Sequence, residues 1–271
     1  MSRRLALAVV GGALAGTALA RSHANAREVP LSPVLGDGYI GPDWVDRRGI
    51  GREPRVGEMD DMAAYASAAF DPEAVDGEVR RFYERTTGYR MRFRTTWHRP
   101  FRTGARLAAR ATSRLEQLNL PVDGELRALE SDIVAVDPAV DPRDGARAWT
   151  RIDEETGEAV FVALYASHVH DGERYTNIAV PLPGSNLSTV LRPENMGSGL
   201  RLTTFAPGHP GLYLVTAEGE FALPMDQRFR VWPAGESPVE PPGDGVLAAT
   251  HEMWLGPAQF LTVTYGIERD R

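Results

Sequence analysis

Histidines are the first residues of this sequence whose spacing points to chemistry. His168 and His170 lie two positions apart, and Asp171 and Glu173 follow them closely. On a strand, residues i and i+2 face the same side, so both imidazoles can reach one metal ion. His251 is the candidate third ligand, from a later segment. The alternative interpretation is the polar end of a hairpin that holds no metal.

Arginines gather in one part of the chain. Between Arg80 and Arg114 there are eleven arginines and one acidic residue, a net charge of +10, whereas the remainder has 19 arginines and 36 acidic residues, a net charge of −17. Guanidinium groups suit phosphates, carboxylates and anionic lipid head groups. The candidate ligand- and anion-binding residues lie on one predicted strand and the segment after it: Arg90, Arg92, Arg94, His98, Arg102, Arg106 and Arg110. The alternative is a solvated face whose arginines pair with acidic residues elsewhere.

The composition excludes several kinds of chemistry. All 30 basic residues are arginine, and there is no cysteine. A Schiff-base lysine, the lysine of a nucleotide-binding P-loop, thiol catalysis and cysteine-ligated metals are therefore ruled out. No G-x-S-x-G motif is present, and the glycines at 36, 38 and 41 stand directly before a proline instead of a helix, so we expect neither a serine hydrolase nor a dinucleotide site. The net charge of −7 and the lack of a recognisable motif speak against nucleic-acid binding.

The first 26 residues are typical of a targeting segment. Arg3 and Arg4 precede an uncharged stretch of 16 residues, 5–20, and the sequence Ala24-Asn25-Ala26 is a small-x-small cleavage pattern. Three interpretations remain: a cleaved signal peptide, an uncleaved membrane anchor, or a helix of the folded domain. The first two predict an extracytoplasmic protein that is secreted or anchored.

The remaining chain divides into an extended segment and one domain. Residues 27–70 are rich in proline and glycine and predict a tether or a loop laid over the domain, with a short helix over 59–70. The domain covers 71–271. Asp71 and Pro72 predict the start of an amphipathic helix that ends near Gly88, and a second amphipathic helix is predicted after Pro100.

Short alternating segments separated by turn residues predict the rest of the domain. Residues 89–98 alternate, with Tyr89, Met91 and Phe93 on one face. Further strands are predicted near 131–137, 146–152, 159–168, 175–180, 187–192, 200–205, 212–216, 227–232, 246–254 and 260–267. So many strands without intervening helices indicate an antiparallel meander that curls or closes. The predicted fold class is α+β: a curved antiparallel β-sheet or barrel of about ten strands with two flanking amphipathic helices near its N-terminal end.

Six short segments of the sequence resemble a known family. In chain order they are Phe82–Thr86, Trp97–Arg102, Arg114–Pro121, Val180–Asn186, Val190–Glu194 and Phe260–Tyr265. Together they resemble an uncharacterised family of actinobacterial-type proteins over roughly residues 78–268. The resemblance implies the order of the elements, helix, strand, helix and then many strands, and carries over no activity.

These observations favour one function and leave two alternatives. We expect a non-enzymatic extracytoplasmic binder that holds an apolar or amphipathic anionic ligand in a β-sheet cavity, because curved sheets form cavities and no catalytic set is visible. Its partner would be an amphipathic small molecule or an anionic lipid, and no cofactor is required. One alternative is a metal-dependent enzyme that uses His168, His170 and His251. The other is a structural or interaction module of the cell envelope.

Overall fold

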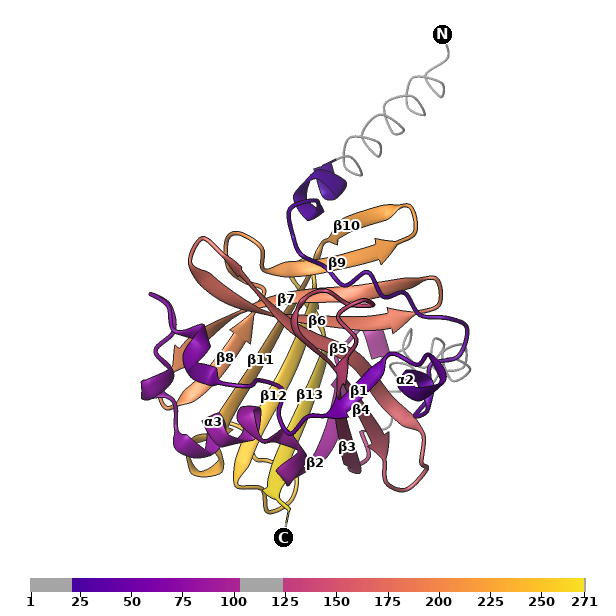
Figure 1. The fold of residues 1–271 in the computed structure, drawn as a ribbon. Helices are drawn as coiled ribbons and strands as arrows, with labels where there is room; N and C mark the ends of the chain where they lie inside the picture. Colours follow the sequence, from indigo (N-terminus) through magenta and orange to yellow (C-terminus); the bar gives the residue numbers. More distant parts are fainter. Residues whose placement is uncertain (1–20, 103–123, 271) are drawn as a thin grey trace, which may run out of the picture.

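Antiparallel strands close into a barrel of ten strands within residues 21–102 and 124–270, which the computed structural model describes (Figure 1). Neighbouring strands around the barrel are β7 (Ser185–Met196), β6 (Glu173–Leu182), β5 (Ala159–His170), β4 (Asp144–Asp153), β3 (Arg127–Val136), β2 (Tyr89–Trp97), β13 (Ala258–Arg269), β12 (Leu247–Leu255), β11 (Met225–Pro233) and β8 (Gly199–Thr203). The ring closes because β7 pairs with both β6 and β8. The predicted barrel of about ten strands is confirmed.

Three further strands lie outside this ring. β9 (Gly211–Thr216) pairs with the first half of β7, and β10 (Gly219–Leu223) pairs with β9. β8 pairs with the second half of β7. The long strand β7 therefore changes partners midway, and the β9–β10 hairpin extends from the end of the barrel. β1 (Gly51–Pro54) pairs with β3.

Alternation and turn chemistry explain the strands. On β2 the side chains of Tyr89, Met91 and Phe93 are buried, while the residues between them are exposed. This period of two places one row of side chains in the barrel interior and the other on the outer surface. The Asp171-Gly172 turn joins β5 to β6, and both residues have positive φ, 51° and 80°. Two positive φ values match the twist of a tight hairpin, which Asp-Gly favours.

The helices are shorter than the sequence predicts. The helix predicted from Asp71 divides into a 3₁₀ turn, η2 (Pro72–Ala74), and a separate helix, α3 (Gly77–Glu84). Each part has its own cap, because Asp71 and then Asp76 accept a backbone N–H two residues further on. The helix predicted over 59–70 is only the 3₁₀ turn η1 (Met62–Tyr65), and η3 (Thr86–Gly88) and η4 (Ala234–Glu236) are also single turns. The helix predicted after Pro100 falls on residues 103–123, outside the described part.

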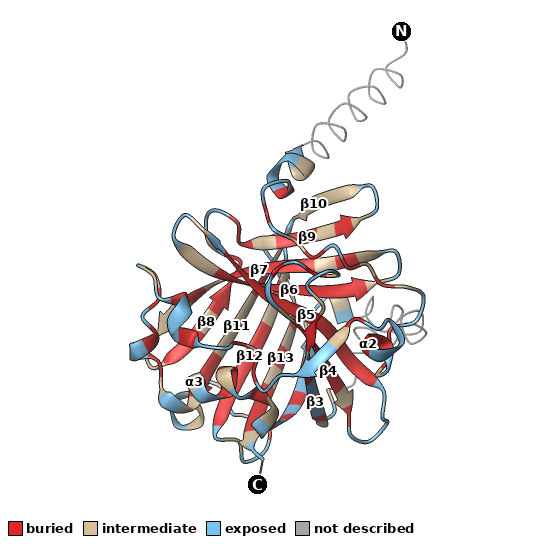
Figure 2. Ribbon diagram, in the orientation of Figure 1, coloured by how far each residue is buried: buried red, intermediate tan, exposed pale blue. Residues whose placement is uncertain are grey.

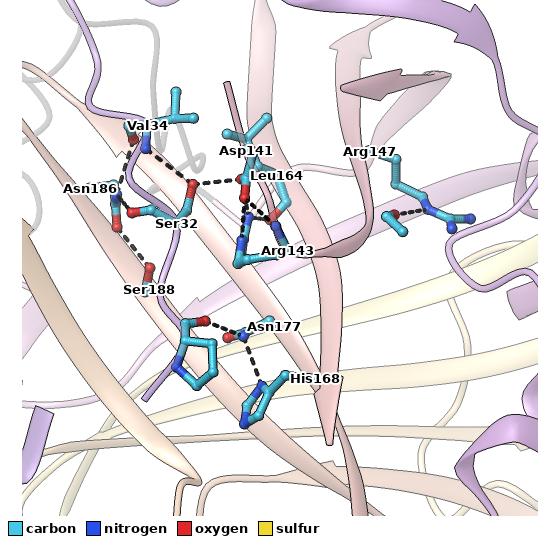
Figure 3. A network of polar contacts seen from close by, with 12 residues as sticks. Ser32, Val34, Asp141, Arg143, Arg147, Leu164, His168, Asn177, Asn186 and Ser188 are labelled. Atoms are coloured by element: carbon cyan, nitrogen blue, oxygen red, sulfur yellow. Dashed lines mark hydrogen bonds and ion pairs between the residues drawn. The ribbon is translucent and has the colours of Figure 1, made fainter. Parts of the chain in front are cut away.

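The segment 26–50 crosses the outer surface of the barrel, and we call it the strap (Figure 1). It ends in a one-turn helix, α2 (Trp44–Arg47). Ile40 and Trp44 of the strap pack against Val162 and Leu164 of β5 in one buried cluster. Buried side chains also hold the strap: Asn186 of β7 donates its amide to the carbonyls of two strap residues, at 2.9 and 3.0 Å (Figure 3).

The strap makes β5 a strand buried on both faces. Its first ten residues are buried without alternation (Figure 2). In contrast, β2, which the strap does not cover, alternates between buried and exposed residues. The inner face of β5 joins the main core cluster through Phe161 and Tyr165. Val79, Phe82 and Tyr83 of α3 belong to the same cluster, so α3 packs against residues of the barrel interior.

Candidate functional site

The barrel interior contains two hollows with shared walls. The larger has a volume of about 230 Å³ and the smaller about 60 Å³. Both are bounded by Arg151 of β4, Tyr165 of β5, Phe229 of β11 and Tyr265 of β13. The walls of the larger one are mostly apolar, and its polar members are Arg151, Thr189, Gln227, His251 and the two tyrosines. An apolar cavity with a few converging polar groups is the usual form of a small-molecule site.

Arg151 is the charged residue that lines both hollows, whereas Glu58 and Arg230 line only the smaller one. It is 8% exposed, and its guanidinium carbon lies 4.4 Å from the centre of the Trp149 ring and 4.9 Å from that of Phe161. Nη2 donates to the hydroxyl of Tyr165 at 2.9 Å. Nε is buried and has no hydrogen-bond partner in the described part of the protein, where Arg151 also forms no ion pair. Burial of a cation without a paired anion costs free energy, so this guanidinium is well suited to bind an anionic group.

Neutral polar groups line the opposite wall. His251 is buried on β12; its ring stacks on that of Phe229, with 3.7 Å between ring centres. Its Nε2 lies 3.0 Å from Oε1 of Gln227, and because an amide oxygen only accepts, Nε2 carries the proton. Burial, and then the charge of Arg151, hold the pKa of His251 well below its ordinary value. His251 is therefore an uncharged donor at neutral pH.

Glu58 is the acidic group at the edge of the interior. It is a wall residue of the smaller hollow, together with Arg151, and of an outer hollow of about 190 Å³ that Asp60 and Arg147 also line. Burial raises the pKa of Glu58 to about 7, and the charges of Arg151 and Arg147 oppose that rise. The carboxyl group therefore changes its charge near neutral pH.

The predicted anion-binding arginines lie elsewhere. Arg90, Arg92 and Arg94 are exposed on the outer face of β2, and the first two pair with Asp270 and Glu268. Neither interior hollow has any of the three in its walls. Further along, Nε2 of His98 contacts the hydroxyl of Thr262 at 2.9 Å, and the backbone N–H of Arg102 donates to the carbonyl of His98. Arg106 and Arg110 lie outside the described residues. Anion binding by this set stays a prediction.

The structure brings two of the three predicted histidines together and adds a fourth. On the outer face of β5, Nε2 of His168 lies 2.9 Å from Nδ1 of His209, and the His170 ring stacks on the His209 ring, 3.7 Å between centres. His251 lies inside the barrel and does not join them. In the ranges 21–102 and 124–270, no three His, Asp or Glu side chains are arranged to hold a metal ion.

Arg151 and Glu58 are not among the site residues predicted from the sequence. For Arg151 a signal exists: it stands two residues after Trp149, on the face of a predicted strand that also carries a large aromatic residue. For Glu58 no signal exists, because it lies in the proline- and glycine-rich segment. Its position depends on the packing of that segment against β4 and α3.

Comparison with known proteins shows a similarity to a bacterial membrane protein. No family model matches the chain, and no solved structure matches it. Within the described residues, no helix is long and apolar enough to cross a membrane. The chain spans 43% of the length of the curated relative it matches. Over 242 residues, 88% of its own length, the chain is 34% identical to the uncharacterized membrane protein YndJ of Bacillus subtilis (strain 168).

Proposed function

We propose that this protein is a non-enzymatic binder of a small apolar molecule that carries one anionic group. The molecule lies inside the barrel, with its apolar part in the larger hollow and its anionic group against Arg151. The observation that carries the proposal is the buried guanidinium of Arg151, which lines an apolar cavity and has no carboxylate partner among the described residues.

The surroundings of Arg151 support an anionic ligand over a structural role. A structural arginine in a protein interior normally has a counter-charge, as Arg143 has: its side chain is 2% exposed and contacts the carboxylate of Asp141 at 2.6 Å. Arg151 instead has two aromatic rings and one neutral hydroxyl. Cation–π contacts stabilise the charge only in part, and they leave Nε free to donate. A carboxylate, sulfonate or phosphate ester accepts such donors well.

The remaining walls select for an apolar body. Phe161, Val180, Leu187, Met253 and Leu261 are among the residues that bound the larger hollow. An aliphatic or aromatic group placed there gains about 25 cal/mol for each Å² removed from water. Gln227 and His251 already hydrogen-bond each other, so they impose little cost on an apolar neighbour.

A matched pair of fluorescent probes tests this proposal. Anilinonaphthalene sulfonate is apolar and anionic, and phenylnaphthylamine has a similar ring system without the charge. We expect both to bind, and Arg151→Met to weaken the sulfonate by roughly 10- to 100-fold while the amine binds as before, because a charge-assisted hydrogen bond contributes about 1.5–3 kcal/mol. Arg52→Met, an exposed arginine of β1 that lines neither interior hollow, is the matched control. Equal binding of the sulfonate to wild type and Arg151→Met would contradict the proposal.

We further propose that the protein acts at a membrane, on its extracytoplasmic side. The 16-residue uncharged stretch after Arg4 and the membrane protein named as its relative support this. Expression of the full chain, and of a chain that starts at Arg27, followed by separation of membrane and soluble fractions, tests it. We expect only the full chain in the membrane or exported fraction. Recovery of both in the cytoplasm would contradict this location.

A further inference from the structure

We propose that Glu58 competes with a bound anion for Arg151, so that the barrel takes up its ligand together with a proton. This inference rests on the proposed function and adds a regulation to the same site. Glu58 and Arg151 are wall residues of the same hollow, and no ion pair joins them. Glu58 therefore brings a titratable charge into the hollow that Arg151 lines, and it leaves the guanidinium without a carboxylate contact.

Hydrogen bonds hold the backbone around Glu58 in place. The N–H of Glu58 donates to the hydroxyl of Thr86 at 2.9 Å, and the N–H of Met59 donates to the carbonyl of Tyr83 at 2.9 Å. On the other side, Nη1 of Arg147 donates to the carbonyl of Gly57 at 2.9 Å. These contacts join the segment to α3, to η3 and to β4. The backbone that carries Glu58 is therefore fixed, and the residue lines the smaller hollow.

The groups that face Glu58 come from several elements. β4 contributes Arg151 and Arg147, η1 contributes Tyr65, α3 contributes Tyr83, and β5 contributes Tyr165. Tyr265 of β13 and Arg230 of β11, which pairs with Glu252, also line the smaller hollow. Burial raises the pKa of Tyr65, Tyr83 and Tyr165, so they stay neutral at physiological pH. Arg147 has a carboxylate partner of its own, Asp60, at 2.7 Å. Within this set, Glu58 is the group whose charge changes near pH 7.

Binding of an anion at Arg151 acts on Glu58 in one direction. The ligand neutralises the field of Arg151, which favoured the ionised carboxylate, and adds a negative charge nearby. Both effects disfavour ionised Glu58 and raise its pKa further. By linkage, a ligand that raises the pKa of Glu58 binds with uptake of a proton. The affinity for that ligand falls as the pH rises above the pKa that Glu58 has in the ligand-free protein. A neutral ligand lacks this coupling.

The experiment measures the affinity of both probes between about pH 6 and pH 8.5, a range centred near the Glu58 pKa and in which the sulfonate itself stays ionised. For the wild-type protein we expect the sulfonate to bind about tenfold more weakly at the upper end, which corresponds to a coupling of about 1.4 kcal/mol. Phenylnaphthylamine should bind equally across the range. Glu58→Gln should bind the sulfonate at every pH as the wild type does at low pH, because the glutamine is a permanent neutral analogue of the protonated carboxyl.

Calorimetry provides a second measurement. Titration of the sulfonate in buffers with different ionisation enthalpies counts the protons taken up on binding. We expect net uptake of up to one proton by the wild type above neutral pH and none by Glu58→Gln. Glu218→Gln, in the exposed turn between β9 and β10, is the matched control and should keep the wild-type uptake.

The outcomes separate this inference from the proposed function. Binding that depends on Arg151 but shows the same pH profile in Glu58→Gln as in the wild type would overturn the role of Glu58 and leave the binding function intact. A sulfonate affinity that does not change with pH in the wild type would do the same. If neither probe binds the wild type at any pH, both proposals fail. Binding of phenylnaphthylamine by Glu58→Gln shows that this variant is folded.

Discussion

The side-chain amide of Asn177 fixes the tautomer of His168 (Figure 3). Its Nδ2 lies 3.0 Å from Nδ1 of His168 and donates to the carbonyl of Pro30 in the strap at 2.8 Å. An amide nitrogen only donates, so Nδ1 of His168 accepts and the ring proton is on Nε2. That proton is donated to Nδ1 of His209 at 2.9 Å. Because Nδ1 of each imidazole accepts a hydrogen bond, both rings are neutral in this arrangement.

Acid should therefore weaken the fold through His168. Burial, and then the neighbouring His209, lower its pKa from 6.5 to about 4. The pKa of His168 is lower in the folded protein than in the unfolded chain, so protonation favours the unfolded chain. The stability present above pH 6.5 is therefore lost as the pH falls from 6.5 through about 4. At about 1.4 kcal/mol for each pH unit, urea unfolding at steps across this range should show a loss of up to about 3 kcal/mol in the wild type.

Two variants separate this effect from general acid denaturation. His168→Gln should be less stable than the wild type at neutral pH and should lose less stability on acidification. His98→Gln, which removes a histidine at the end of β2, should keep the wild-type pH slope. Equal slopes for His168→Gln and the wild type would show that other groups cause the acid sensitivity.

The barrel could be predicted from the sequence because alternation and turns are local. The row Tyr89, Met91 and Phe93 is inward on β2 as expected, and Asp171-Gly172 forms a hairpin turn. The extents of the helices could not be predicted as well. Asp71 and Asp76 are both good caps, and only the packing shows that each begins a separate element. Local sequence signals therefore predict whether most segments form a helix or a strand, but they do not predict where one helical element ends and the next begins.

The site was harder to predict because it depends on which strands lie opposite each other. His168 and His251 belong to β5 and β12, which are separated by several strands in the ring. The strap covers the face of β5 that carries His168, whereas His251 faces the interior. Arg151 and Glu58 line the same hollow only because residues 57–59 pack between β4 and α3. The spacing of residues along the chain shows neither which histidines lie on the same face of the barrel nor that Glu58 and Arg151 line one hollow.

Removal of the carboxylate from the buried pair beneath the strap should destabilise the protein strongly. Asp141 is fully buried, accepts two hydrogen bonds from the guanidinium of Arg143, and accepts another from the hydroxyl of Ser32 at 2.7 Å (Figure 3). Asp141→Asn leaves the guanidinium of Arg143 buried without its counter-charge, at a cost of about 3–5 kcal/mol. Urea unfolding at neutral pH measures this.

The control for this pair is an ion pair on the surface. Glu53 contacts Arg55 at 3.0 Å, with both side chains largely exposed to solvent. Glu53→Gln should change the free energy of unfolding by less than about 1 kcal/mol. A similar small change for Asp141→Asn would mean that the buried pair does not hold the strap.

Filling the larger hollow should block both probes without regard to charge. Ala163 of β5 is fully buried and is a wall residue of that hollow. Ala163→Leu adds three carbon atoms to the space, and we expect at least about a tenfold loss of affinity for the sulfonate and for phenylnaphthylamine alike. Ala217→Leu, in the exposed β9–β10 turn, should leave both affinities unchanged. If Ala163→Leu keeps wild-type affinities, the probes bind outside the barrel.

The glycine before Glu58 should control both stability and the pH dependence of binding. A Cβ atom at Gly57 would lie 2.3 Å from the carbonyl oxygen of Glu84, so Gly57→Ala forces the backbone away from α3. We expect a loss of about 1–3 kcal/mol in urea unfolding. Because the shift also moves the carboxyl group of Glu58, the pH profile of sulfonate binding should change. At Gly38 an added Cβ meets nothing within 4 Å, so Gly38→Ala should leave both measurements unchanged. A wild-type pH profile in a clearly destabilised Gly57→Ala would show that the coupling tolerates a displaced Glu58.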